Sequence, residues 1–435
     1  MIPIAFSHQR LLTRDGHEQR ACASVHESQR RVEETRGQLR RRAGARPYRH
    51  ALHVLLALSL STSVGAQNRQ GPRGLDERRV ALKPLLTIGD ESDDAKRFDR
   101  IVGVTRLPGG EVVVLDGASQ ELRVYASNGD FMRRIGRRGA GPGELENATA
   151  LWRVRDSLFV AEQPPAQSRV NVYDVREGFK GRLLLRARNA ARGVGAVARL
   201  ANGALLVVPA GFRPFVPPPY GRAVRDTTAV GLLQVGDPGE VRWMGEWPSA
   251  SWLSYALSSG PVRTGVARYS LGPVLVLGSS ADRVWIGDSG DGVIKRYDGA
   301  GTFVGVARMP TDRRPYTDSI LARVKVEALG EASTSDERAR IEAEFEIGLR
   351  TRLAPAFARF VPGPDGEMWV MAFNEDPNSR TQAVVFDVGG TAMATAVVPA
   401  RVRVFEVGRD YLAGVHTSNE GVESVVVYAL GSKVR

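Results

Sequence analysis

From about residue 98 onward, apolar and polar residues follow a pattern that recurs along the chain. Each copy has a turn containing Gly, Asn or Asp, an apolar strand, a short polar turn and another strand that ends in an aromatic residue. We number these two strands as the second and third of each unit. Short apolar strands separated by such turn residues are typical of antiparallel hairpins. The pattern therefore predicts a succession of small β-meanders rather than alternating helices and strands.

Copies of this unit begin near residues 109, 156, 202, 282, 365 and 408. Aromatic residues hold equivalent positions at the end of the third strand in five of the copies: Tyr125, Tyr173, Tyr297, Phe386 and Tyr428. Repeats of about 40–50 residues built of four strands are typical of propeller blades, because only stacking between neighbours buries both faces of each meander. We therefore predict an all-β, six-bladed β-propeller over residues 67–435, with a looser third blade that has a Pro-rich insertion and no terminal aromatic.

The two ends of the repeat region are complementary. The sixth copy ends near Leu430 without an outer strand, whereas an isolated apolar segment at residues 80–89 precedes the first copy. An unpaired sheet edge is a liability that closed folds remove. We expect the N-terminal segment to supply the missing outer strand of the last blade.

Residues 311–353 interrupt the β pattern. Thr334 and Glu337 have the spacing of a capping box, and Ile341, Phe345 and Leu349 follow at helical spacing. We predict a helical insertion between blades four and five.

The Gly-rich run Ile135–Leu145 (IGRRGAGPGEL) follows a predicted strand. It is a poor phosphate loop, because Pro142 removes an N–H donor and no Lys follows the last Gly. Together with residues 107–131 (LPGGEVVVLD…LRVYASNGDF), this run resembles the NHL-repeat-like six-bladed β-propellers of exported bacterial proteins. The resemblance covers most of residues 80–430 and implies the same fold.

The N-terminal segment has the features of an export signal. Arginines precede an uncharged apolar run at residues 51–60, and small residues lead to Ala66. We predict a leader and signal peptide over residues 1–66, with cleavage near Ala66 and a periplasmic or secreted product. The alternative is a buried helix at residues 51–66. After processing we expect no membrane segment.

Removal of residues 1–66 changes the apparent chemistry of the chain. The net charge is +12, but eleven arginines against five acids lie in that segment, so the remainder is only mildly basic and we predict no nucleic-acid partner. The single Cys, Cys22, and five of the six His also lie there. Only His416 remains. The lack of Cys excludes Cys-His chemistry, and a single His excludes multi-His zinc sites, in a processed chain.

Carboxylates end several of the predicted second strands: Asp116, Glu162 and Asp288. In a propeller such positions lie near one mouth of the central channel, where they could hold Ca²⁺ as in lactonase-type propellers. The competing interpretation is that each carboxylate accepts hydrogen bonds in its own turn.

We predict two aromatic loops in the third copy: residues 211–222, which are also rich in Pro and Arg, and residues 246–255, which add Trp247, Trp252 and Tyr255. Such side chains can stack on sugars or peptides and fix an anionic group. The candidate ligand-binding residues are Phe212, Arg213, Phe215, Tyr220, Arg222, Trp247, Trp252, Tyr255 and, from the sixth copy, His416. Alternatively, these aromatics pack on the rim of the propeller itself.

The sequence thus favours a monomeric, non-catalytic module without a cofactor that recognises a protein, peptide or glycan. The alternative is a Ca²⁺-dependent enzyme of the lactonase or lyase type that uses the channel.

Overall fold

The computed structural model describes residues 74–434, except 164–166, 192, 211–215, 236–238, 258–262, 311–312 and 352. The predicted leader and signal peptide, and the candidate residues Phe212, Arg213 and Phe215, lie outside the described residues. In the part that is described, no helix is both long and apolar enough to cross a membrane.

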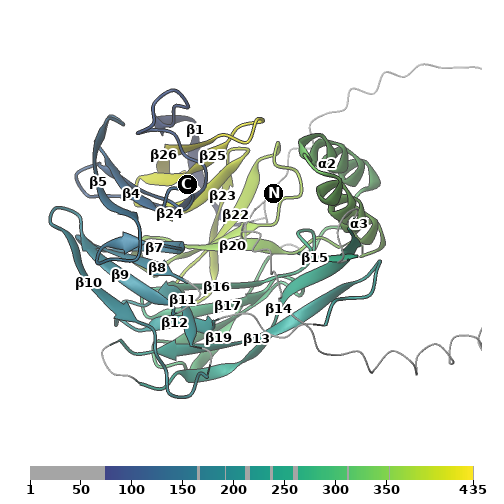
Figure 1. Ribbon diagram of the computed structural model, residues 1–435, viewed down its shortest axis with the longest axis horizontal. Helices are drawn as coiled ribbons and strands as arrows, with labels where there is room; N and C mark the ends of the chain where they lie inside the picture. Colours follow the sequence, from purple (N-terminus) through teal and green to yellow (C-terminus); the bar gives the residue numbers. More distant parts are fainter. Residues whose placement is uncertain are drawn as a thin grey trace, which may run out of the picture. The chain divides into compact units, whose positions relative to one another are not determined.

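The described chain is mostly β-structure in antiparallel meanders (Figure 1). The first sheet contains β2 (Ile101–Arg106), β3 (Val112–Asp116), β4 (Glu121–Tyr125), β5 (Phe131–Arg138) and the short β6 (Glu144–Leu145). The second contains β7 (Ala148–Val154), β8 (Ser157–Glu162), β9 (Arg169–Asp174) and β10 (Gly178–Leu184). The third contains β11 (Val194–Arg199), β12 (Leu205–Pro209), β13 (Ala223–Leu233), β14 (Arg242–Ala256) and β15 (Thr264–Arg268). The fourth contains β16 (Leu275–Ser280), β17 (Arg283–Asp288), β18 (Val293–Asp298) and β19 (Phe303–Arg308).

The last sheet has eight strands because β1 joins two meanders. One meander is β20 (Phe357–Pro362), β21 (Met368–Ala372), β22 (Thr381–Phe386) and β23 (Ala392–Val398), and the other is β24 (Val402–Val407), β25 (Tyr411–Thr417) and β26 (Glu423–Val434). Strand β1 (Asp76–Ile88) pairs antiparallel with β26, with Ile88 opposite Val425, and its first residues pair in parallel with β23. The prediction that the segment before the first repeat pairs with the C-terminal strand is confirmed.

The first strands of successive meanders contact one another. Strand β2 contacts β7, and the contacts continue through β11, β16, β20 and β24, which returns to β2. Sheets arranged around such a ring of first strands pack face to face, so each buries its apolar residues against both neighbours. This arrangement is a β-propeller.

The predicted aromatic positions have like surroundings. Tyr125, Tyr173, Tyr297, Phe386 and Tyr428 are all buried, each in a hydrophobic cluster that joins neighbouring meanders. Each lies opposite an apolar residue near the start of the second strand, as Tyr125 lies opposite Val112. In three sheets an aromatic of the fourth strand meets the ring edge-on, as Phe131 meets Tyr125 with centroids 5.8 Å apart. The repeat period therefore reflects a repeated packing position.

The third sheet departs from the prediction. Residues 246–255 were predicted as an aromatic loop but belong to β14, which continues to Ala256. The backbone of this segment forms a ladder with β13, where Leu253 lies opposite Ala223, and with β15, where Tyr255 lies opposite Gly265. Pairing on both sides satisfies its backbone donors and acceptors, so the aromatics are held on a sheet rather than on a loop.

Two helices lie between β19 and β20 in the chain: α2 (Asp318–Glu331) and α3 (Ser335–Thr351). The Thr334 hydroxyl accepts a hydrogen bond from the Glu337 N–H at 3.1 Å, and the Glu337 carboxylate accepts from the Thr334 N–H at 3.2 Å, which is the reciprocal capping box. Buried residues of both helices form one cluster with Leu253, Tyr269 and Leu271 of the third sheet region. The helices therefore pack against the extended part of β14.

Candidate functional site

The register of the meanders brings several predicted site residues to the same end of their sheets. Asp116 lies opposite Ile101, Glu162 opposite Ala148 and Asp288 opposite Leu275. In each case the last residue of the second strand faces the first residue of the first strand. His416, one residue before the end of β25, likewise lies opposite Val402, the first residue of β24. We term this end of the sheets the upper end.

The carboxylates of Asp116 and Glu162 accept hydrogen bonds from groups of their own sheet regions. The Asp116 carboxylate accepts from the Ala118 N–H at 3.0 Å and from the Ser119 hydroxyl at 2.9 Å. Glu162, which is fully buried, accepts from the Glu146 N–H at 2.6 Å and from Arg169 Nε at 2.8 Å. Both acids therefore act as acceptors for local donors.

Asp288 is shared between two elements. Its carboxylate accepts from the Gly290 N–H at 2.8 Å and forms an ion pair with Arg225 of β13 at 2.9 Å. Across the described ranges, no group of three or more His, Cys, Asp or Glu side chains is arranged to hold a metal ion. The structure thus does not gather the three predicted acids into a metal site.

His416 is partly buried at the end of β25, opposite Ser424. Burial and the nearby positive charge of Arg401 lower the pKa of His416, so its imidazole is neutral at pH 7. A neutral imidazole can donate one hydrogen bond and accept another.

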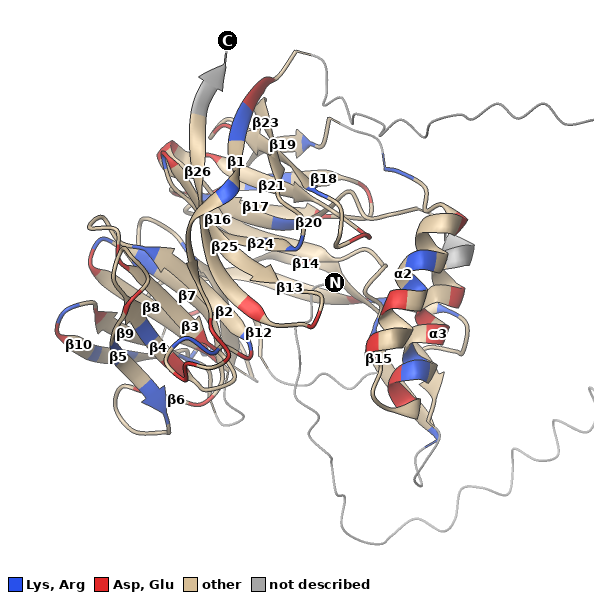
Figure 2. Cartoon of the chain, turned by 90° about the horizontal axis from the view of Figure 1, so that it is seen from above, with Lys and Arg blue, Asp and Glu red and all other residues tan. Residues whose placement is uncertain are grey.

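Helices α2 and α3 extend over the upper end. Glu327 of α2 forms an ion pair with Arg401, just before β24, at 2.7 Å, and Arg323 pairs with Asp376, in the loop after β21, at 2.8 Å. Figure 2 shows both acidic and basic residues along the two helices. The helices thus bridge from the third sheet to the last one.

The predicted aromatics separate into two groups. Trp247 is 8% exposed and packs edge-on against Tyr297, with ring centroids 6.3 Å apart, so it belongs to the core. Tyr255 packs partly against the helix cluster, and burial raises the pKa of its hydroxyl. For these two residues the structure favours the packing interpretation over a ligand-binding one.

The other group comprises Trp252, which is half-buried, and Tyr220, which is exposed. Trp252 lies between Val224 and Arg268 in a row across β13, β14 and β15. Because Leu253 is in the helix-facing cluster, alternation along the strand places Trp252 on the opposite face of the sheet. Arg222 is exposed, as is Tyr220, whose hydroxyl lies 2.6 Å from Thr264 Oγ1.

Three arginines at the upper end were not identified from the sequence. Arg268 ends β15, whereas Arg359 and Arg403 lie within the first strands β20 and β24. Desolvation by the surrounding protein lowers the pKa of each, although Arg268 still exposes part of its side chain to solvent. The sequence does contain a signal for such residues, which is an arginine within an otherwise apolar first strand such as FARFVP. A charge in such a strand is costly to bury unless it has a partner or a function.

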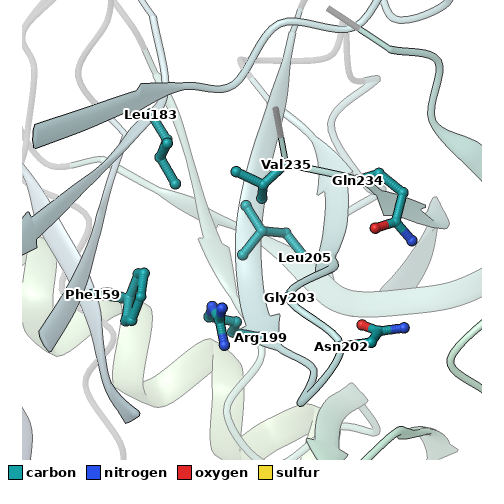
Figure 3. A pocket seen from close by; sticks show the side chains of 8 residues that line it. All are labelled: Phe159, Leu183, Arg199, Asn202, Gly203, Leu205, Gln234 and Val235. Carbon is teal, nitrogen blue, oxygen red and sulfur yellow. The ribbon is translucent and has the colours of Figure 1, made fainter. Parts of the chain in front are cut away.

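A separate pocket of about 260 Å³ lies at the opposite, lower end of the second and third sheets (Figure 3). Phe159, Leu183 and Leu205 line it, together with Arg199, whose guanidinium lies 4.5 Å from the centre of the Phe159 ring. None of the predicted site residues that the structure describes lines this pocket.

No protein-family model matches the chain, and no curated protein sequence matches it. A solved member of the DUF4221 family from Bacteroides vulgatus is similar at 10% identity, covering 82% of this chain and 99% of that one, with a TM-score of 0.45. A calcium-binding protein, regucalcin, from Agrobacterium tumefaciens is similar at 10% identity over 82% and 97% of the chains, with a TM-score of 0.40. The Swd1 β-propeller domain of Myceliophteria thermophila shares 12% identity over 80% and 99% of the chains, with a TM-score of 0.34. At these scores the likenesses carry no argument about ligands or activity.

Proposed function

We propose that the chain is an exported, six-bladed β-propeller of the NHL-repeat-like type that acts as a non-catalytic recognition module for a protein, peptide or glycan. Six blades are supported by the first strands β2, β7, β11, β16, β20 and β24, which contact one another in a ring. In this arrangement β1 closes the last blade, and α2 and α3 are an insertion between the fourth and fifth blades. Export rests on the basic and apolar pattern of residues 1–66.

The observation that carries the recognition role is the second layer at the upper end. The extended halves of β13 and β14, with β15, α2 and α3, form a hydrophobic cluster of their own. Closing a propeller does not require such a layer, because the blades already bury one another. This packed layer of β13, β14, β15, α2 and α3 at the upper end, which we term the platform, is therefore best explained as a rigid support for binding residues.

The outward face of this platform supplies suitable side chains. The half-buried Trp252 and the exposed Tyr220 present aromatic surface at low conformational-entropy cost, and Arg222 and Arg268 supply positive charge. Aromatic and Arg side chains are the residues that most often dominate binding energy at interfaces.

Binding of the purified protein to glycan and peptide arrays tests this function. Tyr220→Ala and Trp252→Ala should each weaken binding of any array ligand by about tenfold or more, as truncation of an interface hot spot does. Phe303→Ala is the matched control, because Phe303 is an aromatic that is 53% exposed on the outer strand β19. Equal loss from all three variants would contradict a platform-specific site.

A calcium titration of the same protein separates the two functional classes. Tight stoichiometric binding that is lost in Asp116→Ala or Asp288→Ala would favour the metal-dependent enzyme over recognition. We expect neither substitution to cause a calcium-dependent change in array binding. The carboxylates of Asp116 and Asp288 already accept hydrogen bonds from other groups of the protein.

A further inference from the structure

Two arginines from neighbouring first strands share one aromatic ring. Arg359 lies on β20, and Arg403 and Phe405 lie on β24, which contacts β20. The guanidinium carbon of Arg359 is 4.5 Å from the centre of the Phe405 ring, and that of Arg403 is 4.9 Å away. Both arginines are near the start of their strands, so the group lies at the upper end.

Only one of the two positive charges is compensated. Arg403 donates to the Glu423 carboxylate at 2.9 Å and to the Ile101 carbonyl at 2.7 Å. The second oxygen of Glu423 accepts from the Ile101 N–H at 2.5 Å, which fixes that carboxylate beside Arg403. Within the described ranges, Arg359 has neither a hydrogen-bond partner nor an ion-pair partner beyond the Phe405 ring.

The electrostatic situation of Arg359 is unfavourable without an anion. Burial and the charge of Arg403 lower the pKa of Arg359 to about 10, so the side chain is still protonated at neutral pH. No nitrogen of Arg359 is among the buried polar atoms that lack a partner in the described part of the chain, so its donors reach solvent. A ligand can therefore approach a cation that has already lost part of its hydration.

The chemistry of the group selects a class of ligand. The planar guanidinium fork matches a carboxylate or a phosphate through paired hydrogen bonds. Two arginines and one glutamate leave a single net positive charge, which a monoanion neutralises and a dianion overcompensates. The balance therefore favours a carboxylate over a phosphate dianion.

We propose that Arg359, supported by Phe405 and Arg403, binds a carboxylate of the ligand that is recognised at the upper end, such as an acidic sugar or a peptide C-terminus. This inference rests on the proposed recognition function. It adds an anion-specific position in the ring of first strands, next to the platform. Arg359 forms the direct contact, Phe405 positions its guanidinium, and Arg403 adds a second positive charge.

Isothermal titration of the full chain with glucuronate, glucose, N-acetylglycine and inorganic phosphate tests the proposal. We expect binding of the two carboxylates, weaker binding of phosphate and none of glucose. Arg359→Gln should weaken carboxylate binding by about tenfold or more, which is the cost of losing a charge-assisted pair of hydrogen bonds. The ratio of glucuronate to N-acetylglycine affinity distinguishes an acidic sugar from a peptide C-terminus.

The melting temperature of the same variant distinguishes a binding residue from a structural one. Removing an uncompensated cation should leave the melting temperature of the unliganded protein unchanged or raise it, whereas loss of a structural contact would lower it. Arg409→Gln is the control, because Arg409 is exposed and paired with Asp365 at 2.6 Å.

Unchanged carboxylate affinity in Arg359→Gln, stronger binding of phosphate than of carboxylate, or a lowered melting temperature with unchanged affinity would overturn the inference. Array binding that is lost in Trp252→Ala but retained in Arg359→Gln would overturn the anion site and leave the recognition function standing. Carboxylate binding by a protein that binds no array ligand would leave the anion site standing and overturn the recognition function.

Discussion

At the scale of single residues, a carboxylate that is buried in this protein lies beside hydrogen-bond donors. Glu344 of α3 is 3% exposed and accepts hydrogen bonds from the Ser270 N–H, at 2.6 Å, and from the Ser270 hydroxyl. Arg340 lies one turn earlier, with its guanidinium 3.2 Å from the carboxylate. The side chain thereby ties α3 to the segment between the third and fourth sheets.

Burial raises the pKa of Glu344 despite these donors. An acid whose pKa is higher in the folded state stabilises the fold most below its unfolded pKa, and that contribution is lost as the pH rises through the folded pKa. We therefore predict that Glu344→Gln, which keeps the acceptor oxygen without the charge, becomes progressively more stable relative to the parent protein from about pH 4.5 to neutral pH.

Urea unfolding of both proteins at several pH values between these limits measures this difference. Glu342→Gln is the control, because Glu342 is exposed on the same helix. A pH-independent difference between Glu344→Gln and the parent protein would show that burial of the charge does not govern this site.

At the scale of elements, the capping box at the start of α3 stabilises a helix of the platform. Thr334→Ala removes the acceptor for the Glu337 N–H, and loss of such an N-cap costs about 1 kcal/mol of stability. Thr334→Ser keeps the hydroxyl and should retain most of that stability. Chemical denaturation measures both variants, and equal stability of the two would contradict a capping role.

The sequence predicted those elements whose signal is local. The strands, their aromatic positions and the capping box at Thr334 depend on residues close in the chain, and these agree with the structure. The extension of β14 was missed because Pro248 and the mixed polar pattern of residues 246–255 resemble a loop. Two partner strands, β13 and β15, override that local preference.

The candidate site was less predictable than the fold for a related reason. Trp247 and Trp252 look alike in sequence, yet one packs against Tyr297 of the next sheet and the other faces away from the helices. Arg359 and Arg403 are far apart in the chain and meet at Phe405 only because their strands are neighbours in the ring. Such tertiary contacts leave no periodic signal.

At the scale of the whole repeat region, strand β1 joins the two ends. Strand β1 covers β26, which would otherwise expose a long row of unpaired backbone groups. Ile88 is almost fully buried in the same cluster as Tyr125 and Val425, so β1 also contributes to the core. Opening this contact is therefore expected to loosen the first and last meanders together.

A designed disulfide between β1 and β26 tests this closure. Arg79 lies opposite Gly431, both are exposed, and a Cβ on Gly431 would lie 3.8 Å from that of Arg79, which suits a disulfide. In a Cys22→Ser background, Arg79→Cys with Gly431→Cys should cross-link on oxidation and raise the free energy of unfolding by about 2–4 kcal/mol. Lys83→Cys with Gly431→Cys is the control, because the register shifts between Val80 and Pro84, and Pro84 lies opposite Tyr428, three residues or roughly 10 Å along β26 from Gly431. Gel mobility of oxidised and reduced protein after denaturation reports the cross-link. If the control pair links as readily as the designed pair, the segment is not held in the register that closes the ring.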